Sequence, residues 1–251
     1  MTTYPYGRTM LVGLVAVAGL MGLPWQAQTA PTFLGPTPYL SFIDSPFNVS
    51  GFTYFYLETF EDGVLNTPGA TASPGWTVLN PGVSTDSVDG DDGTIDGSGT
   101  SGRSFYSSDS QTSVTITFNA AALGGNLPTH AGIVWTDVGN VLSGTSGFGD
   151  VTLSALDAMS LPLGSITGTT LGDGTVSGAT AEDRFFGVTN AAGILSITIS
   201  MNNSIDWEVD HLQYGFADQT AVPEPATLTL CGLGTLALLG YNWRRKKGAQ
   251  L

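Results

Sequence analysis

The sequence predicts an all-β fold, a two-sheet β-sandwich, between residues 51 and 217. Short runs of β-branched and aromatic residues alternate with clusters of Gly, Asp, Asn and Ser, which are typical of turns. No long stretch repeats its hydrophobic residues at the helical period. Hydrophobic residues occupy every second position in Val114–Phe118 and in Leu195–Ile199, with Ser or Thr between them. We expect each of these strands to bury one face and expose the other.

Eight strands follow from these runs, and a further short strand is expected inside a loop region. Residues 31–50 contain four prolines and are expected to form an extended lead-in, because proline removes backbone donors from a central strand. Residues 62–103 hold Pro-Gly, Asp-Gly and Ser-Gly steps and are expected to be long loops around a strand at Trp76–Leu79. The eight expected strands are Phe52–Glu58, Ser104–Ser107, Ser113–Phe118, Gly132–Thr136, Val151–Leu156, Arg184–Val188, Ile194–Ser200 and Ile205–Tyr214.

Charge is distributed unevenly along the 251 residues. Between residues 31 and 222 only two basic residues, Arg103 and Arg184, stand against twenty of the twenty-one acidic residues. Such an anionic segment repels nucleic acid and anionic lipid, so neither is an expected partner. Cys231 is the single cysteine, which excludes an intrachain disulfide and a CxxC zinc site.

Residues 1–30 predict a secretory signal peptide. Arg8 is the only charge, residues 10–23 are apolar, and small residues follow at 27–30, where we expect cleavage. An uncleaved anchor is the alternative. The apolar run favours the cleaved signal, because glycines and Pro24 interrupt it and it is shorter than the ~20 residues that cross a bilayer.

The other end of the chain has three parts. A linker at 218–225 contains a Pro-Glu-Pro step, residues 226–243 are apolar, and residues 244–251 begin with Arg-Arg-Lys-Lys. The apolar part is long enough for a transmembrane helix, and the basic cluster is expected on the cytoplasmic side. The preceding domain would then lie outside the inner membrane, and a plain single-pass anchor is the alternative to a sorting signal.

This tail resembles the PEP-CTERM sorting signal. The resemblance implies recognition by an exosortase, a membrane transpeptidase, and export to the cell surface or beyond it. The implied partners are the exosortase, the secretion machinery, the inner membrane before processing, and exopolysaccharide. The residues that carry the resemblance are Pro223, Glu224 and Pro225, followed by Trp243, Arg244 and Arg245.

The stretch from Leu57 to Gly215 resembles a jelly-roll domain of exported PEP-CTERM proteins, with Phe-Glu-Asp-Gly at 60–63 and Val-Asp-His-Leu-Gln-Tyr-Gly at 209–215. It also resembles carbohydrate-binding jelly rolls more distantly. In those modules the first and last strands meet and hold a structural calcium ion. The resemblance therefore implies a jelly-roll-like sandwich with calcium as its cofactor.

Two groups of carboxylates are candidate calcium ligands, because calcium prefers several hard oxygen ligands. The first group combines Glu58, Glu61 and Asp62 with Asp210, with an ordinary turn at 61–63 as the alternative. The second lies in an acidic loop whose spacing does not match an EF-hand, so a solvated loop is favoured there. Its candidate ligands are Asp89, Asp91 and Asp92. A lone His211 is more often satisfied by a neighbouring residue than bound to an ion.

Sugar recognition in jelly rolls uses exposed aromatic rings. Trp76, Tyr106 and Trp207 are the candidate sugar-binding residues, whereas Trp135 lies in an apolar run and is expected to be buried. Catalytic signatures such as GxSxG and HExxH are absent from the sequence, so we expect a non-enzymatic surface or matrix protein. Two alternatives remain, a secreted glycoside-processing enzyme and a structural or adhesive component without a ligand.

Overall fold

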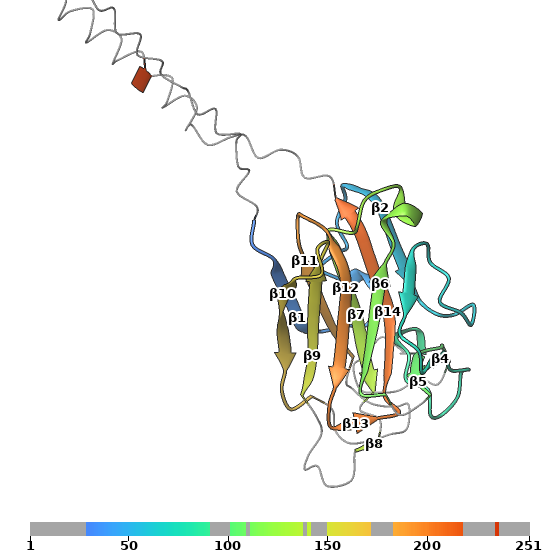
Figure 1. Cartoon of the computed structure of the whole chain (residues 1–251). Coiled ribbons are helices and arrows are strands. Elements are labelled where there is room, and N and C mark those ends of the chain that lie inside the picture. The colour runs from blue at the N-terminus through green and yellow to red at the C-terminus, as the bar shows by residue number, and fades with distance from the viewer. Residues whose placement is uncertain are drawn as a thin grey trace, which may run out of the picture.

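The computed structural model describes residues 29–90, 101–108, 111–137, 140–141, 150–171, 183–217 and 234–235. Two antiparallel sheets pack face to face, as the sequence predicts (Figure 1). The predicted signal peptide and membrane span lie outside the described residues, apart from residues 29–30 and 234–235. Among the described residues, no helix is long and apolar enough to cross a membrane.

The larger sheet contains seven of the described strands and carries most of the polar residues discussed below. Its order is β1-β11-β7-β14, after which β14 pairs with β2 along one half and with β5 along the other, and β4 follows β5. The strands are β1 (Thr32–Pro38), β11 (Arg184–Thr189), β7 (His130–Asp137), β14 (Glu208–Ala217), β2 (Phe52–Glu58), β5 (Phe105–Ser107) and β4 (Trp76–Val78).

The smaller sheet contains five described strands in the order β10-β9-β12-β6-β3. Two short strands form a separate pair near one end of the sandwich (Figure 1), and the described connections contain three 3-10 helices. The bounds are β10 (Pro162–Gly168), β9 (Val151–Asp157), β12 (Ile194–Met201), β6 (Ser113–Phe118), β3 (Ala70–Ala72), β8 (Asn140–Val141), β13 (Ser204–Ile205), η1 (Phe42–Asp44), η2 (Val88–Gly90) and η3 (Ala120–Leu123).

Some strands differ from the sequence prediction. The lead-in contains β1, which is an edge strand, the position in a sheet where proline is tolerated. The expected strand at 205–214 is divided between β13 and β14, and the latter continues to Ala217. Strands β3 and β10 were not predicted, because three residues are too short for a pattern and β10 contains glycines.

The main core lies between the sheets. It contains the alternating residues of β6, as predicted, together with Trp135 and Trp207. On β12 a register shift between Ile194 and Ser196 places Ile194 in the core and leaves Leu195 half-buried, so the predicted inward position of Leu195 is wrong. A bulge of this kind interrupts the period of two on which the prediction depended.

A second, smaller core covers the outer face of the seven-stranded sheet. Tyr39 and Phe47 from the lead-in pack there with Val88, Val134 and Phe185. Strand β14 is therefore covered on both faces, and its first eight residues are buried. Any polar side chain on this strand must find its hydrogen-bond partners inside the protein.

Candidate functional site

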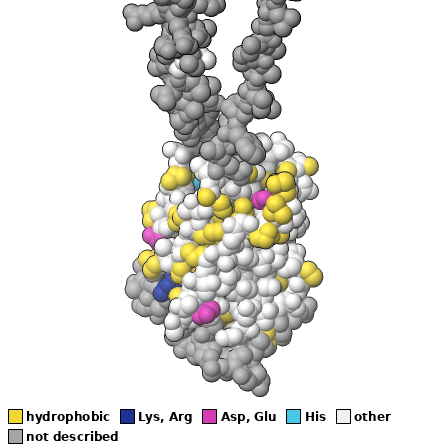
Figure 2. All heavy atoms as spheres, turned by 60° about the vertical axis from the view of Figure 1, so that its left-hand side comes forward, with side chains coloured by type: hydrophobic (Ala, Val, Ile, Leu, Met, Phe, Trp, Pro, Cys, Tyr) yellow, Lys and Arg dark blue, Asp and Glu magenta, His cyan; other side chains and the backbone are white. Residues whose placement is uncertain are grey.

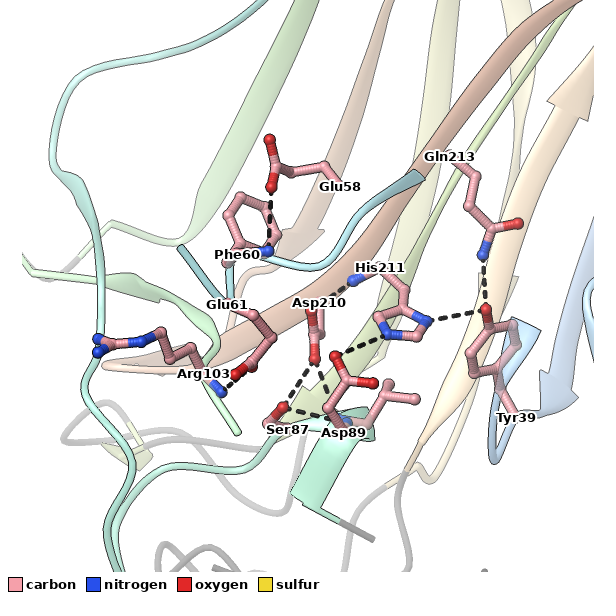
Figure 3. Close-up of polar contacts among 11 residues, drawn as sticks. Tyr39, Glu58, Phe60, Glu61, Ser87, Asp89, Arg103, Asp210, His211 and Gln213 are labelled. Carbon is pink, nitrogen blue, oxygen red and sulfur yellow. Dashed lines mark hydrogen bonds and ion pairs between the residues drawn. The ribbon is translucent and has the colours of Figure 1, made fainter. Parts of the chain in front are cut away.

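Strand β14 has a bulge that turns polar residues toward the second core. Asp210 pairs with Val134 and Gln213 pairs with Gly132, so the stretch in β14 has one residue more than its partner. His211 adopts a left-handed backbone conformation there, with φ of 43°. Asp210, His211 and Gln213 consequently all contact residues of the lead-in or of the segment 85–90, as Figure 3 shows.

Asp210 is completely buried and is held by three donors. Its Oδ2 accepts hydrogen bonds from the Ser87 hydroxyl and the Val88 N–H, each at 3.0 Å. Its Oδ1 accepts from the His211 N–H at 2.6 Å. Burial raises the pKa of Asp210 to about 7, against the opposing effects of the imidazole and N–H of His211.

His211 lies between a tyrosine and a carboxylate. Its Nδ1 is 3.0 Å from the Tyr39 hydroxyl, and its Nε2 is 3.3 Å from Oδ2 of Asp89. Burial alone would lower the pKa of this imidazole, but the charges of Asp210 and Asp89 outweigh that effect and raise the pKa. The side chain of Asp89 is 39% exposed, so the cluster reaches the surface through this residue.

The structure brings together predicted ligands from two different groups. One ligand atom each from Asp89, Asp210 and His211 lies within 4.8 Å of the others. Strands β2 and β14 are adjacent, as expected for the first and last strands, but Glu58 pairs with Leu212 and does not face Asp210. Asp91 and Asp92, the other predicted ligands of the acidic loop, lie outside the described residues.

Glu58 anchors the loop that follows β2. Its Oε1 accepts the Phe60 N–H at 3.0 Å, and its Oε2 accepts the N–H groups of Asn66 and Thr67 at 3.0 and 3.1 Å. The side chain is 5% exposed. Three backbone donors therefore compensate the loss of water around this buried carboxylate. In these contacts Glu58 holds the loop that follows β2.

Glu61 and Asp62 also bind groups of their own surroundings. Glu61 accepts a hydrogen bond from the Arg103 N–H (Figure 3). Asp62 accepts the Val64 N–H at 3.1 Å and the side-chain amide of Asn66. The segment is the turn that the sequence analysis gave as its alternative, closed by a hydrogen bond from the Gly63 N–H to the Phe60 carbonyl.

Glu208 is a buried acidic residue that the sequence analysis did not single out. It is 1% exposed and accepts hydrogen bonds from the Asp86 N–H at 2.9 Å and from the Ser104 hydroxyl. With Asp210, it fixes the segment 85–88 against β14. The available signal was a pair of acidic residues, Glu208 and Asp210, two positions apart in a strand that also contains Val209, Leu212 and Tyr214.

The aromatic candidates differ in exposure. Trp135 is fully buried, as expected, and Trp207 is also fully buried, with its Nε1 donating to the Gln111 carbonyl at 2.8 Å. No face of the Trp207 ring is therefore open to a sugar. Trp76 and Tyr106 are half-buried on the adjacent strands β4 and β5 and keep part of their surface exposed.

A shallow depression lies at the end of the sandwich where β14 finishes. Its volume is about 360 Å³, and small or apolar residues form most of its lining. No acid, base or hydroxyl group contributes to this lining, which includes Ala120, Asn126, Leu127, Ala191 and Phe216.

Comparison with known proteins identifies the tail. The family model described as the PEP-CTERM protein-sorting motif matches residues 221–246. The chain carries a PEP-CTERM motif. The predicted resemblance of the tail to the PEP-CTERM signal is confirmed, and the matched range spans the predicted sorting residues Pro223, Glu224, Pro225, Arg244 and Arg245. The PEP-CTERM motif implies export, a membrane-anchored sorting signal and processing by an exosortase before surface display.

The folded domain is similar to a domain of known structure. This is the K1 cleaved adhesin domain of Lys-gingipain from Porphyromonas gingivalis W83, which is 16% identical. The alignment covers 65% of this chain and 98% of that one, with a TM-score of 0.36. No curated protein matches the chain.

Proposed function

We propose that the protein is a non-enzymatic component of the cell surface or extracellular matrix, delivered by its PEP-CTERM tail. The single observation that carries this proposal is the PEP-CTERM motif at 221–246, directly after a folded β-domain that ends at Ala217. In this proposal the signal peptide directs export, the β-domain is displayed, and the tail is processed.

The arrangement of the strands supports display away from the membrane. Thr32 pairs with Thr189, Thr189 with His130, and His130 with Gly215. The start of β1 and the end of β14 therefore lie at the same level of the sheet, three strand positions apart. Three strand spacings of about 4.8 Å put these two ends roughly 14 Å apart. Strand β1 begins and strand β14 ends on the side of the sandwich opposite to β8 and β13 (Figure 1), so the side with β8 and β13 would project outward.

The strand order supports the jelly-roll assignment. The long strands are ordered β2-β14-β7-β11 in one sheet and β6-β12-β9-β10 in the other. Successive long strands therefore cross between the sheets, except β9 and β10, which pair with each other. This is the connectivity expected of a double Greek key. The fold carries no function by itself, so the argument for display rests on the tail.

The buried acids support a non-enzymatic role. Among the described residues, Glu58, Glu208 and Asp210 each accept hydrogen bonds from backbone N–H groups. A glycoside-processing enzyme requires two carboxyl groups that face a substrate cleft.

Neutral exopolysaccharide is the partner that we propose for the displayed domain. The outer face of the smaller sheet presents hydroxyl groups in cross-strand register, with Thr115 bonded to Thr198 and Thr152 bonded to Thr167, each at 2.8 Å. Most side chains visible in Figure 2 are uncharged. Such a surface can exchange hydrogen bonds with sugar hydroxyls without charge repulsion. Trp76 and Tyr106 lie on β4 and β5 of the other sheet and are not part of this face.

Sorting is tested by replacing Pro223, Glu224 and Pro225 with alanine in the full chain, expressed in a host that contains an exosortase. The wild-type protein should lose its tail and reach the surface or medium, whereas the variant should stay in the membrane fraction at full mass. Pro81→Ala, in an exposed loop, is the control. Surface delivery of the alanine variant at the wild-type level would contradict the proposal.

Polysaccharide binding is tested separately with Thr198→Glu, which places a charge in the centre of the hydroxyl face. Co-sedimentation with neutral exopolysaccharide from the host should decrease at least several-fold. Val83→Glu adds the same charge at a loop residue that is 73% exposed and should leave binding unchanged. Equal binding by both variants would exclude this face as the contact surface.

A further inference from the structure

Asp89, Asp210 and His211 form a compact cluster, in which Asp210 also anchors the segment 85–88. The residues come from η2 and from the bulge of β14, which are separated by about 120 positions in the sequence. The outer face of the seven-stranded sheet places their ligand atoms within 4.8 Å of one another (Figure 3). We propose that these three residues bind a zinc ion.

The spacing of the ligand atoms suits a small tetrahedral ion. Two ligands that each lie about 2.0–2.2 Å from zinc are about 3.3–3.6 Å apart in a tetrahedral site. Nε2 of His211 and Oδ2 of Asp89 are 3.3 Å apart. A carboxylate oxygen of Asp210 supplies the third ligand, and a water molecule would complete the coordination on the exposed side of Asp89.

Neighbouring residues already orient the histidine. The Tyr39 hydroxyl lies 3.0 Å from Nδ1 of His211 and accepts a hydrogen bond from the Gln213 amide at 2.9 Å. Gln213 in turn accepts from the Ser45 hydroxyl at 2.5 Å. Metal-binding histidines generally have their second ring nitrogen fixed by such a partner, which sets the ring orientation. Zinc binding through Nε2 requires the tautomer in which Nδ1–H donates to the Tyr39 oxygen.

The ligand types favour zinc over calcium. Calcium requires six to eight oxygen ligands, whereas zinc is satisfied by one imidazole nitrogen and carboxylate oxygens. The carboxylates of Glu58, Glu61 and Asp62 bind local groups and do not join the cluster. A divalent cation would also compensate two neighbouring carboxylates, one of which is completely buried.

The test is zinc binding by the full-length protein, purified in detergent and stripped with a chelator. Calorimetric titration with zinc chloride should give one ion per chain, with affinity decreasing at acid pH because the ion competes with a proton for His211. Asp89→Asn and His211→Asn should each weaken binding at least ten-fold. Asparagine suits position 211 because it tolerates the left-handed backbone.

Two controls and one positioning variant complete the experiment. Asp157→Asn, on the opposite sheet, and His130→Gln, at the other histidine, should bind zinc as the wild type does. Tyr39→Phe keeps the ring packing on Phe185 but removes the hydroxyl, and it should weaken zinc binding about ten-fold.

Three results would overturn the proposal. They are the absence of stoichiometric zinc binding, wild-type affinity in Asp89→Asn, and calcium binding at this cluster in place of zinc. Asp89 is partly exposed, so its variant should fold even if changes at the buried residues prevent folding. The titration does not involve the tail, and its failure is therefore distinguishable from a failure of sorting.

Discussion

Glu58→Gln tests whether this carboxylate holds the loop after β2 or binds an ion. In the structure, Oε2 accepts two backbone N–H groups and Oε1 accepts a third. The glutamine amide oxygen can keep the two bonds to Asn66 and Thr67, but its NH₂ group then faces the Phe60 N–H. One hydrogen bond is lost, and the other two become neutral.

The magnitude follows from ordinary hydrogen-bond energies. A hydrogen bond to a charged group contributes about 1.5–3 kcal/mol, and a neutral bond about 0.5–1.5 kcal/mol. Losing one charged bond and replacing two others by neutral bonds should reduce the free energy of unfolding by about 3.5–6 kcal/mol. This is a large part of the roughly 5–15 kcal/mol that stabilises an ordinary domain.

The assay is guanidinium unfolding of the full-length protein in detergent, followed by the fluorescence of the buried Trp135 and Trp207. Glu61→Gln is the matched control, because this exposed carboxylate accepts one backbone N–H and an amide oxygen can replace it. The control should change stability by less than about 1 kcal/mol. Equal unfolding midpoints for Glu58→Gln and Glu61→Gln would refute the reasoning. An effect of Glu58→Gln that disappears in EDTA would instead indicate a metal ligand.

Two further predictions concern pH and packing. Folding raises the pKa of Asp210 to about 7 and also raises the pKa of His211. Between about pH 5 and pH 8 the folded protein therefore binds more protons than the unfolded chain. In chelator, the melting temperature should therefore fall from pH 5 to pH 8, and Asp210→Asn should flatten this slope; an unchanged slope would contradict the assignment. Gly132→Ala places a Cβ atom 2.5 Å from the Phe185 ring and should cost about 1–3 kcal/mol. Gly82→Ala meets no atom closer than 4.0 Å and should cost less than about 0.5 kcal/mol, and equal melting temperatures of the two variants would refute this packing argument.

Local patterns predicted much of the fold. The observed β2 and β6 have the bounds that the sequence predicted, because their hydrophobic alternation or aromatic content is visible within a few residues. The same period failed at Leu195, where a bulge inserts one residue. Bulges depend on the partner strand and on the space in the core, and neither can be read from a single run of residues.

The candidate site was predicted only in part. Asp210 and Asp89 were both candidate ligands, but they were assigned to different groups, and His211 was expected to be satisfied by a neighbour. The bulge at 210–213 turns the three residues toward one another and toward the lead-in residue Tyr39. A strict alternation would have pointed neighbouring residues of β14 to opposite faces of the sheet.

The sequence by itself determined the sorting tail and the all-β class. A sorting signal is a contiguous run of residues, and the alternation of hydrophobic and polar residues in a strand is visible over a few positions. Only the tertiary structure decided which carboxylates accept hydrogen bonds from backbone N–H groups and which lie close to one another in the cluster with His211. Contacts between positions more than a hundred residues apart, such as Ser87 with Asp210, depend on how the lead-in and the segment 85–90 cover the outer face of the sheet.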